Sequence, residues 1–124
     1  MSKKITILVV DDSTLSRKKA STILSERYNI IQSSNGVLGL QSVKENNPDC
    51  IFCDLLMPEM DGFEFLKKIS ELYPKIPCTI ITADIQEQTH TECIKLGAKD
   101  VLKKPAKKDD LLQAVESMLQ GIKK

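Results

Sequence analysis

Five polar residues stand where apolar stretches of this sequence end, and their types suit the binding of a charged group. Asp11 and Asp12 follow "ITILVV", Asp54 follows "CIFC", Thr82 follows "PCTII" and Lys104 follows "DVLK". Three carboxylates held close together repel one another. A hard divalent cation such as Mg²⁺ relieves that repulsion, because it prefers oxygen ligands and takes one or two carboxylates. A lysine and a hydroxyl beside the cation suit a phosphoryl group bound to it.

The same apolar stretches predict the strands that must position these residues. Strands are expected over residues 4–10, 28–33, 50–54, 77–82 and 100–104. Stretches with the apolar spacing of helices alternate with these strands. The predicted helices run from Ser13 or Asp12 to about Glu26, over 36–46, over 63–73, from about Gln86 to Gly97, and over 108–122. This strict alternation predicts an α/β fold: a doubly wound, five-stranded parallel sheet flanked by five helices, in a flavodoxin-like three-layer sandwich.

The predicted fold explains why residues so far apart in sequence can form one site. In open parallel sheets, ligands bind at the carboxyl ends of the strands. The five polar residues follow or end four of the strands, so they are expected to meet at one edge of the sheet. Asp61 also lies near this edge, but we interpret it as the cap of the helix that begins at Gly62, where aspartate is favoured.

Apolar positions in two of the helices indicate which faces pack on the sheet. In the helix over 63–73, the expected buried face carries Phe63, Leu66, Ile69 and Leu72 or Tyr73. In the helix over 108–122 it carries Leu111, Leu112, Val115, Met118, Leu119 and Ile122. The strands are continuously apolar, which fits a sheet buried on both faces.

Composition bounds the function classes. The chain has 124 residues and a net charge of +1, so we expect one domain and no bulk attraction to nucleic acid or an anionic membrane. No apolar run approaches the roughly 18 residues of a membrane span. The N-terminal apolar run is too short for a signal peptide and lacks a small-residue cleavage site. We therefore expect a cytoplasmic protein without membrane insertion.

The four cysteines, Cys50, Cys53, Cys78 and Cys93, are interpreted as buried free thiols. "CIFC" has the C-x-x-C spacing of some redox and zinc sites. However, it lies in a predicted strand, where residues three apart point to opposite faces. Cys50 and Cys53 are therefore not expected to share a metal or a disulfide.

Four motifs in order, "VVDDS", "FCDLLMPEMDGFEFL", "IITA" and "GAKDVLKKP", carry a resemblance to a known family. Across nearly its whole length the chain resembles the receiver domain of bacterial two-component response regulators, of the single-domain, chemotaxis (CheY-like) type. The domain would span residues 1–124. The segment D-x-x-M-P-x-M-D-G is the most diagnostic of the four.

The resemblance implies a role for each site residue. Asp54 would accept a phosphoryl group from a phosphohistidine on a sensor histidine kinase. Asp12, Asp54 and the backbone carbonyl of Leu56 would bind Mg²⁺ directly, and Asp11 through water. Thr82, with the small Ala83 beside it, would bind the phosphoryl oxygens, and Lys104 would pair with Asp54 and then with the phosphoryl group. The Lys104–Pro105 peptide would be cis.

The chain departs from the family pattern at position 101, where relatives carry Tyr or Phe and this sequence has Val101. The aromatic part of the usual signal relay is therefore absent, and we expect the signal to run through Thr82 and the segment 83–87. Leu56 and Asp84 are expected to set the lifetime of the phosphorylated state. Because Leu56 cannot orient a water molecule, slow self-dephosphorylation is expected.

Other charged residues are interpreted as surface groups. His90 lies in a polar helical stretch and is expected to be solvated. Lys103 alternates with Lys104 in the last strand, so only one of the two can point at the site. The neighbouring Lys107 and Lys108 have no interleaved aromatic residues of the kind that bind nucleic acid, so no direct nucleic-acid partner is expected.

The resemblance implies a phosphorylation-activated switch rather than an enzyme with an external substrate. Only self-phosphorylation and self-dephosphorylation are expected. The output would be binding to a protein through the fourth helix, fifth strand and fifth helix, with a flagellar motor switch or other chemotaxis protein as a candidate partner. Two alternatives stay open: a phosphorelay intermediate or phosphate sink, and the receiver fragment of a longer DNA-binding regulator.

Overall fold

The computed structural model describes residues 4–84 and 86–122 as five strands alternating with five helices. The strands are β1 (Thr6–Val10), β2 (Asn29–Ser33), β3 (Cys50–Asp54), β4 (Cys78–Thr82) and β5 (Asp100–Lys103). The helices are α1 (Thr14–Leu24), α2 (Gly36–Asn46), α3 (Gly62–Leu72), α4 (Glu87–Lys95) and α5 (Lys108–Ile122). The described residues contain no helix with the length and apolar character needed to cross a bilayer.

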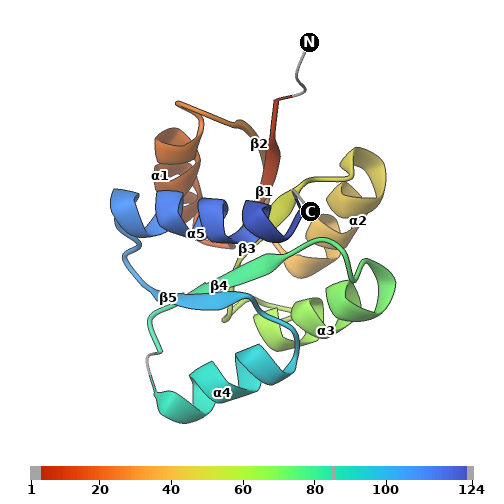
Figure 1. Cartoon of the computed structure of the whole chain (residues 1–124). Coiled ribbons are helices and arrows are strands. Elements are labelled where there is room, and N and C mark those ends of the chain that lie inside the picture. Colours follow the sequence, from red (N-terminus) through yellow and green to blue (C-terminus); the bar gives the residue numbers. More distant parts are fainter. Residues whose placement is uncertain (1–3, 85, 123–124) are drawn as a thin grey trace.

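All neighbouring strands run parallel in one sheet of order β2-β1-β3-β4-β5. Helices α1 and α5 cover one face, and α2, α3 and α4 cover the other (Figure 1). This confirms the predicted three-layer α/β sandwich. The chain order reverses between β1 and β3, so the carboxyl ends of these two central strands open side by side, as ligand sites in such sheets require.

Side chains of each strand alternate between the two cores. Phe52 and Cys50 pack under α1 and α5, while Ile51 and Cys53 pack under α2 and α3. Cys50 and Cys53 therefore lie on opposite faces of the sheet, as predicted, and all four cysteines are buried and free.

Side-chain caps begin the first three helices where the sequence indicated. Ser13, rather than Asp12, caps α1 by accepting from the Ser16 amide at 3.3 Å. Asn35 accepts from the Leu38 amide at 2.9 Å, and Asp61 accepts from the Glu64 amide at 3.0 Å. These bonds satisfy amide groups that have no partner within the helix. Helix α1 ends at Leu24, two residues before the predicted end at Glu26.

The buried face of α3 agrees with the predicted one except that it also includes Phe65, which the sequence analysis left out. Phe65 is fully buried with Leu66 and Ile69, whereas Phe63 is only partly buried and Leu72 is 63% exposed. A stripe of every third residue drifts by about 60° per step around a helix of 3.6 residues per turn. The stripe is therefore only partly buried at Phe63, and of the two alternatives predicted at its other end, Tyr73 packs against the core while Leu72 does not.

In α5, Leu111, Val115, Met118 and Leu119 are buried as predicted, and Leu112 is partly buried. The side chain of Ile122 lies outside the described residues.

Candidate functional site

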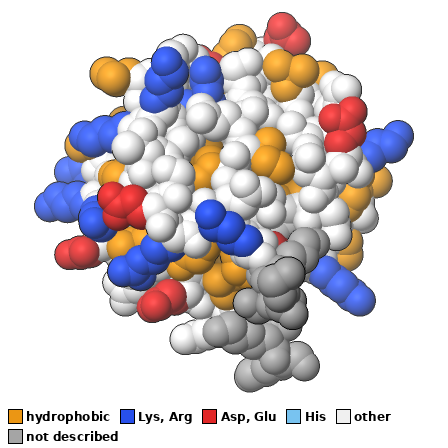
Figure 2. Space-filling view, turned by 90° about the horizontal axis from the view of Figure 1, so that it is seen from above, with side chains coloured by type: hydrophobic (Ala, Val, Ile, Leu, Met, Phe, Trp, Pro, Cys, Tyr) orange, Lys and Arg blue, Asp and Glu red, His pale blue; other side chains and the backbone are white. Residues whose placement is uncertain are grey.

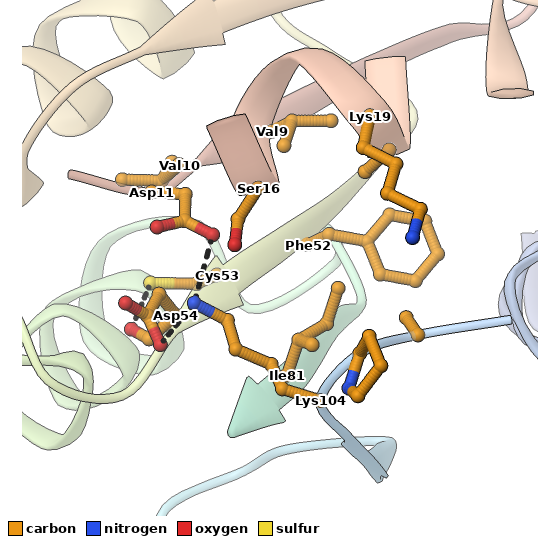
Figure 3. A pocket seen from close by; sticks show the side chains of 13 residues that line it. Val9, Val10, Asp11, Ser16, Lys19, Phe52, Cys53, Asp54, Ile81 and Lys104 are labelled. Atoms are coloured by element: carbon orange, nitrogen blue, oxygen red, sulfur yellow. Dashed lines mark hydrogen bonds and ion pairs between the residues drawn. The ribbon is translucent and has the colours of Figure 1, made fainter. Parts of the chain in front are cut away.

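The predicted site residues meet at the carboxyl edge of the sheet. Asp11 directly follows β1, Asp54 ends β3 and Thr82 ends β4, while Lys104 directly follows β5. Adjacent strands are in register there, with Val10 opposite Cys53 and Asp54 opposite Ile81. Figure 3 shows the side chains of Asp11 and Asp54 pointing toward the amine of Lys104.

Asp11, Asp12 and Asp54 form an acidic cluster. Each offers a carboxylate oxygen, and these oxygens all lie within 4.8 Å of one another. Asp11 and Asp54 are buried, whereas Asp12 is exposed. The donor set is hard oxygen, with one carboxylate open to solvent, and this fits a cation that keeps part of its water shell. The cluster therefore suits a metal ion.

Lys104 joins the two buried acids. Its Nζ lies 3.1 Å from Oδ2 of Asp11 and 3.3 Å from Oδ1 of Asp54. The expectation named Asp54 as the partner, and the structure adds Asp11. Lys103 is exposed, as the alternation of the strand predicts. The Lys104–Pro105 peptide is cis, as the resemblance implies.

The buried acids have an unusual charge balance. The pKa of Asp54 is raised to about 6, because burial and the charge of Asp11 both raise it and Lys104 only partly offsets them. Burial by itself lowers the pKa of Lys104, but its hydrogen bond to Asp11 and the charges of both acids outweigh this and raise it. Lys104 is thus charged at neutral pH, whereas the charged form of the Asp54 carboxylate is energetically unfavourable.

Thr82 is connected to the start of α4. Its Oγ1 accepts a 3.1 Å hydrogen bond from the Asp84 amide. The carboxylate of Asp84 in turn accepts from the Gln86 amide at 3.0 Å and from the Thr89 hydroxyl at 2.7 Å. These bonds lower the pKa of Asp84. Each of its two carboxylate oxygens therefore accepts one hydrogen bond, one from the Gln86 amide at the cap of α4 and one from Thr89 within α4.

The remaining predicted site residues lie in the loops beside the cluster. Leu56 follows β3 by two residues, and its side chain is 69% exposed. Ala83 follows Thr82 and is exposed. Val101 is partly buried against the core under α4, and His90 is exposed on α4.

A small cavity of about 40 Å³ lies beside the acids (Figure 3). Its apolar walls include Val9, Phe52 and Ile81, and Ser16 and Lys19 of α1 stand at its side. These walls explain the burial of Asp11 and Asp54, whose carboxylates border the cavity. The sequence did not single out Ser16 or Lys19.

Arg17 is a further residue that sequence analysis did not single out. Its Nη1 donates a 2.7 Å hydrogen bond to the backbone carbonyl of Asp11. The one available signal was its position on α1, six residues after Asp11, and that spacing alone does not show where the guanidinium points.

Charged side chains of both signs lie on the face shown in Figure 2. Basic side chains there are interspersed with acidic and uncharged ones rather than forming a continuous stripe. Lys107 and Lys108 are exposed, and Lys108 pairs with Glu26 at 3.4 Å.

Comparisons with known proteins agree on one family for this chain. The response regulator receiver domain family matches residues 7–116. The transcriptional regulatory protein ZraR of Escherichia coli (strain K12) is 39% identical over 116 residues, which are 93% of this chain and 26% of that protein. The chain thus spans about a quarter of the length of this relative.

Two further similar proteins are of nearly the same length as this chain. The chemotaxis protein CheY of Bacillus subtilis (strain 168) is 32% identical over 115 residues, covering 91% of this chain and 96% of that protein. A crystal structure of a response regulator receiver domain protein from Clostridium thermocellum has a TM-score of 0.90 at 25% identity, covering 96% and 97% of the two chains. With the fold and the acidic edge of the sheet, these matches show that this chain belongs to the response regulator receiver domain family of two-component signalling.

Proposed function

We propose that this protein is a phosphorylation-activated switch in which Asp54 accepts a phosphoryl group from a sensor histidine kinase in the presence of Mg²⁺. The observation that carries the proposal is the pairing of Lys104 with both Asp11 and Asp54 beside the exposed Asp12. Asp54 is the phosphoacceptor of the three acids. The carboxylate of Asp11 is also held by the Ser13 amide at 2.9 Å, and Asp12 is outside the contact with Lys104.

In the transfer, an oxygen of Asp54 forms a bond to phosphorus while the bond between phosphorus and the donor imidazole breaks. The bonding electron pair stays on the imidazole nitrogen. Lys104 would balance negative charge on the phosphoryl oxygens, and the Thr82 hydroxyl would donate a hydrogen bond to one of them. Asp12, Asp54 and the Leu56 carbonyl would hold Mg²⁺, which supplies charge neutralisation at the phosphoryl group. The protein modifies only itself.

The output is a change in affinity for a protein partner, of the chemotaxis type. The match to a chemotaxis protein over 96% of its length supports this form of output. The proposed binding surface is α4, β5 and α5, because the hydrogen bonds from Thr82 through Asp84 lead to α4. Nucleic acid is not a proposed partner. The four free thiols fit a reducing, cytoplasmic setting.

Val101 favours a second candidate function, that of a phosphorelay intermediate or phosphate sink. With no aromatic ring at this position, one route from the phosphoryl group to the output surface is absent. Binding of a target other than a kinase only when Asp54 carries a phosphoryl group or its analogue would support the switch. Phosphoryl exchange without any such binding would support the relay.

The test of the site is phosphorylation of the purified protein by acetyl phosphate, read by intact mass with and without Mg²⁺. A single phosphoryl adduct that requires Mg²⁺ and is lost in Asp54→Ala is expected. Asp61→Asn is the matched control, because it removes a neighbouring acid while asparagine still caps α3. An adduct that persists in Asp54→Ala, or no adduct on the wild-type protein, would contradict the proposal.

A further inference from the structure

Arg17 holds the turn that carries the two adjacent aspartates. Its side chain runs back from α1, and Nη1 donates to the carbonyl of Asp11 at 2.7 Å while Nε donates to Oε1 of Gln32 at 3.3 Å. Gln32 belongs to the edge strand β2. One half-buried guanidinium therefore joins the end of β1, helix α1 and the edge of the sheet.

The carbonyl that Arg17 holds belongs to the peptide between Asp11 and Asp12. The other polar groups of Asp11 are held by different partners: its amide donates to the Ser33 carbonyl at 3.1 Å, and its carboxylate contacts the Ser13 amide and Lys104. Within residues 4–84 and 86–122, the Asp12 side chain makes no hydrogen bond or ion pair. The direction of its carboxylate thus depends on the orientation of this peptide.

We infer that Arg17 is a positioning residue for the cation site: by fixing the Asp11–Asp12 peptide, it directs the Asp12 carboxylate toward the oxygens of Asp11 and Asp54. The inference rests on the proposed function, because it concerns the Mg²⁺ site described there. Arg17 itself touches neither the cation nor the phosphoryl group. It acts through the backbone of the residues that do.

Two effects of Arg17 on cation binding have opposite signs, and this makes the inference testable. As a positive charge near the cluster, Arg17 repels a cation, so its removal should strengthen binding. Because Arg17 also fixes the Asp11–Asp12 peptide, it orients the Asp12 carboxylate, so its removal should weaken cation binding. The charge effect is small because the guanidinium is partly solvated and screened by salt. The positioning effect should dominate, since loss of a group that orients a metal ligand typically costs about 10–100-fold in affinity.

The experiment measures the Mg²⁺ dissociation constant of the unphosphorylated protein by amide chemical shifts at fixed ionic strength. For Arg17→Met we expect it to rise about tenfold. Arg17→Lys should give an intermediate value, because an ammonium can reach the carbonyl but lacks the fork that also reaches Gln32. Arg27→Met is the matched control: it removes one positive charge from an exposed position, and its dissociation constant should stay within about twofold of wild type.

A second readout separates positioning from damage to the phosphoacceptor. At saturating Mg²⁺, the rate of phosphorylation of Arg17→Met by acetyl phosphate should return to near the wild-type rate, because Asp54 and Lys104 are intact. Thermal denaturation without cations checks that the variant folds. If it does not, Gln32→Leu and Arg17→Lys take its place, and both are expected to weaken Mg²⁺ binding measurably.

Unchanged or tighter Mg²⁺ binding in Arg17→Met would overturn the inference, as would unchanged binding in both substitute variants. Either result would mean that Arg17 affects cation binding only through its charge. Failure of the wild-type protein to bind Mg²⁺ is a different outcome, because it would contradict the proposed function rather than the role of Arg17.

Discussion

Burial of Asp54 makes its charged carboxylate form unfavourable, and this lowers the stability of the folded protein. Its pKa is raised from an ordinary value of 3.8 to about 6, first by burial and then by the charge of Asp11. The charged form is therefore disfavoured in the folded protein. The resulting loss of stability grows as pH rises from about 4 to about 6 and is complete above that range.

Asp54→Asn should consequently stabilise the protein in the absence of divalent cations. We expect the free energy of unfolding at pH 8 to rise by about 1–3 kcal/mol, since each unit of pKa shift corresponds to about 1.4 kcal/mol. Lys104 keeps Asp11 as a partner in this variant. Urea denaturation at pH 8 and pH 4 checks the prediction, and the gain should vanish at pH 4. A destabilised variant at pH 8 would contradict it.

We expect Leu56 to influence how water would reach a phosphoryl group on Asp54. Its side chain is 69% exposed beside the acids and has no polar atom to orient an attacking water. The carboxylate of Asp84 is held at the start of α4 by hydrogen bonds from the Gln86 amide and the Thr89 hydroxyl. Leu56→Asn is therefore expected to speed loss of the phosphoryl group several-fold, measured by intact mass after removal of the donor. Leu72→Asn, an exposed leucine on α3, is the control, and equal lifetimes in all three proteins would refute the idea.

At the scale of elements, we expect the connection between Thr82 and α4 to carry the signal that an aromatic residue at position 101 would otherwise help to carry. The Thr82 hydroxyl is held by the Asp84 amide, and the Asp84 carboxylate is held by the Gln86 amide and Thr89. Movement of Thr82 toward a phosphoryl group would break the first of these bonds. The first turn of α4 is then the element that responds, in line with the expected route through residues 83–87, of which residue 85 lies outside the described ranges.

Thr89→Val should weaken this connection while leaving the site intact. In the wild-type protein, a beryllofluoride analogue at Asp54 is expected to shift the amide signals of α4. In Thr89→Val the α4 shifts should shrink, and those next to Asp54 should remain. Thr91→Val, a change at an exposed position of the same helix, serves as the comparison. Full-sized α4 shifts in Thr89→Val would exclude the Asp84 route.

At the scale of the whole molecule, two cores on the two faces of the sheet enclose all four thiols. Cys50, Cys53, Cys78 and Cys93 are each at most 1% exposed. Burial raises the pKa of Cys50 to about 12 and also raises that of Cys78. Reactive thiolate is therefore scarce in the folded state, which agrees with structural rather than redox cysteines.

Thiol labelling with a chromogenic disulfide reagent should report global opening of the fold. We expect all four cysteines to react at once in denaturant, and at least about 100-fold more slowly in the native protein at pH 8. Immediate reaction of one thiol in the native protein would show that its core layer opens locally.

The sequence by itself determined the elements and the kinds of residue at the edge of the sheet. Alternating apolar and helical stretches predict five strands and five helices, and the caps Asn35 and Asp61 mark the starts of α2 and α3 correctly. These features depend on neighbours a few residues apart, so local rules suffice. Asp54, Thr82 and Lys104 could be assigned to one edge because parallel strands share a direction.

Only the tertiary structure decided which side chains meet and which are buried. The burial of Phe65, and the packing of Tyr73 rather than Leu72 on the core, follow from the rotation of α3 about its axis, which is set by packing on the sheet. Asp11 and Asp12 are adjacent, yet one is buried against Lys104 and the other faces solvent. Arg17 reaches back to the Asp11 carbonyl because β1, α1 and β2 converge there. Contacts of this kind depend on several elements at once, and residue spacing along one element does not specify them.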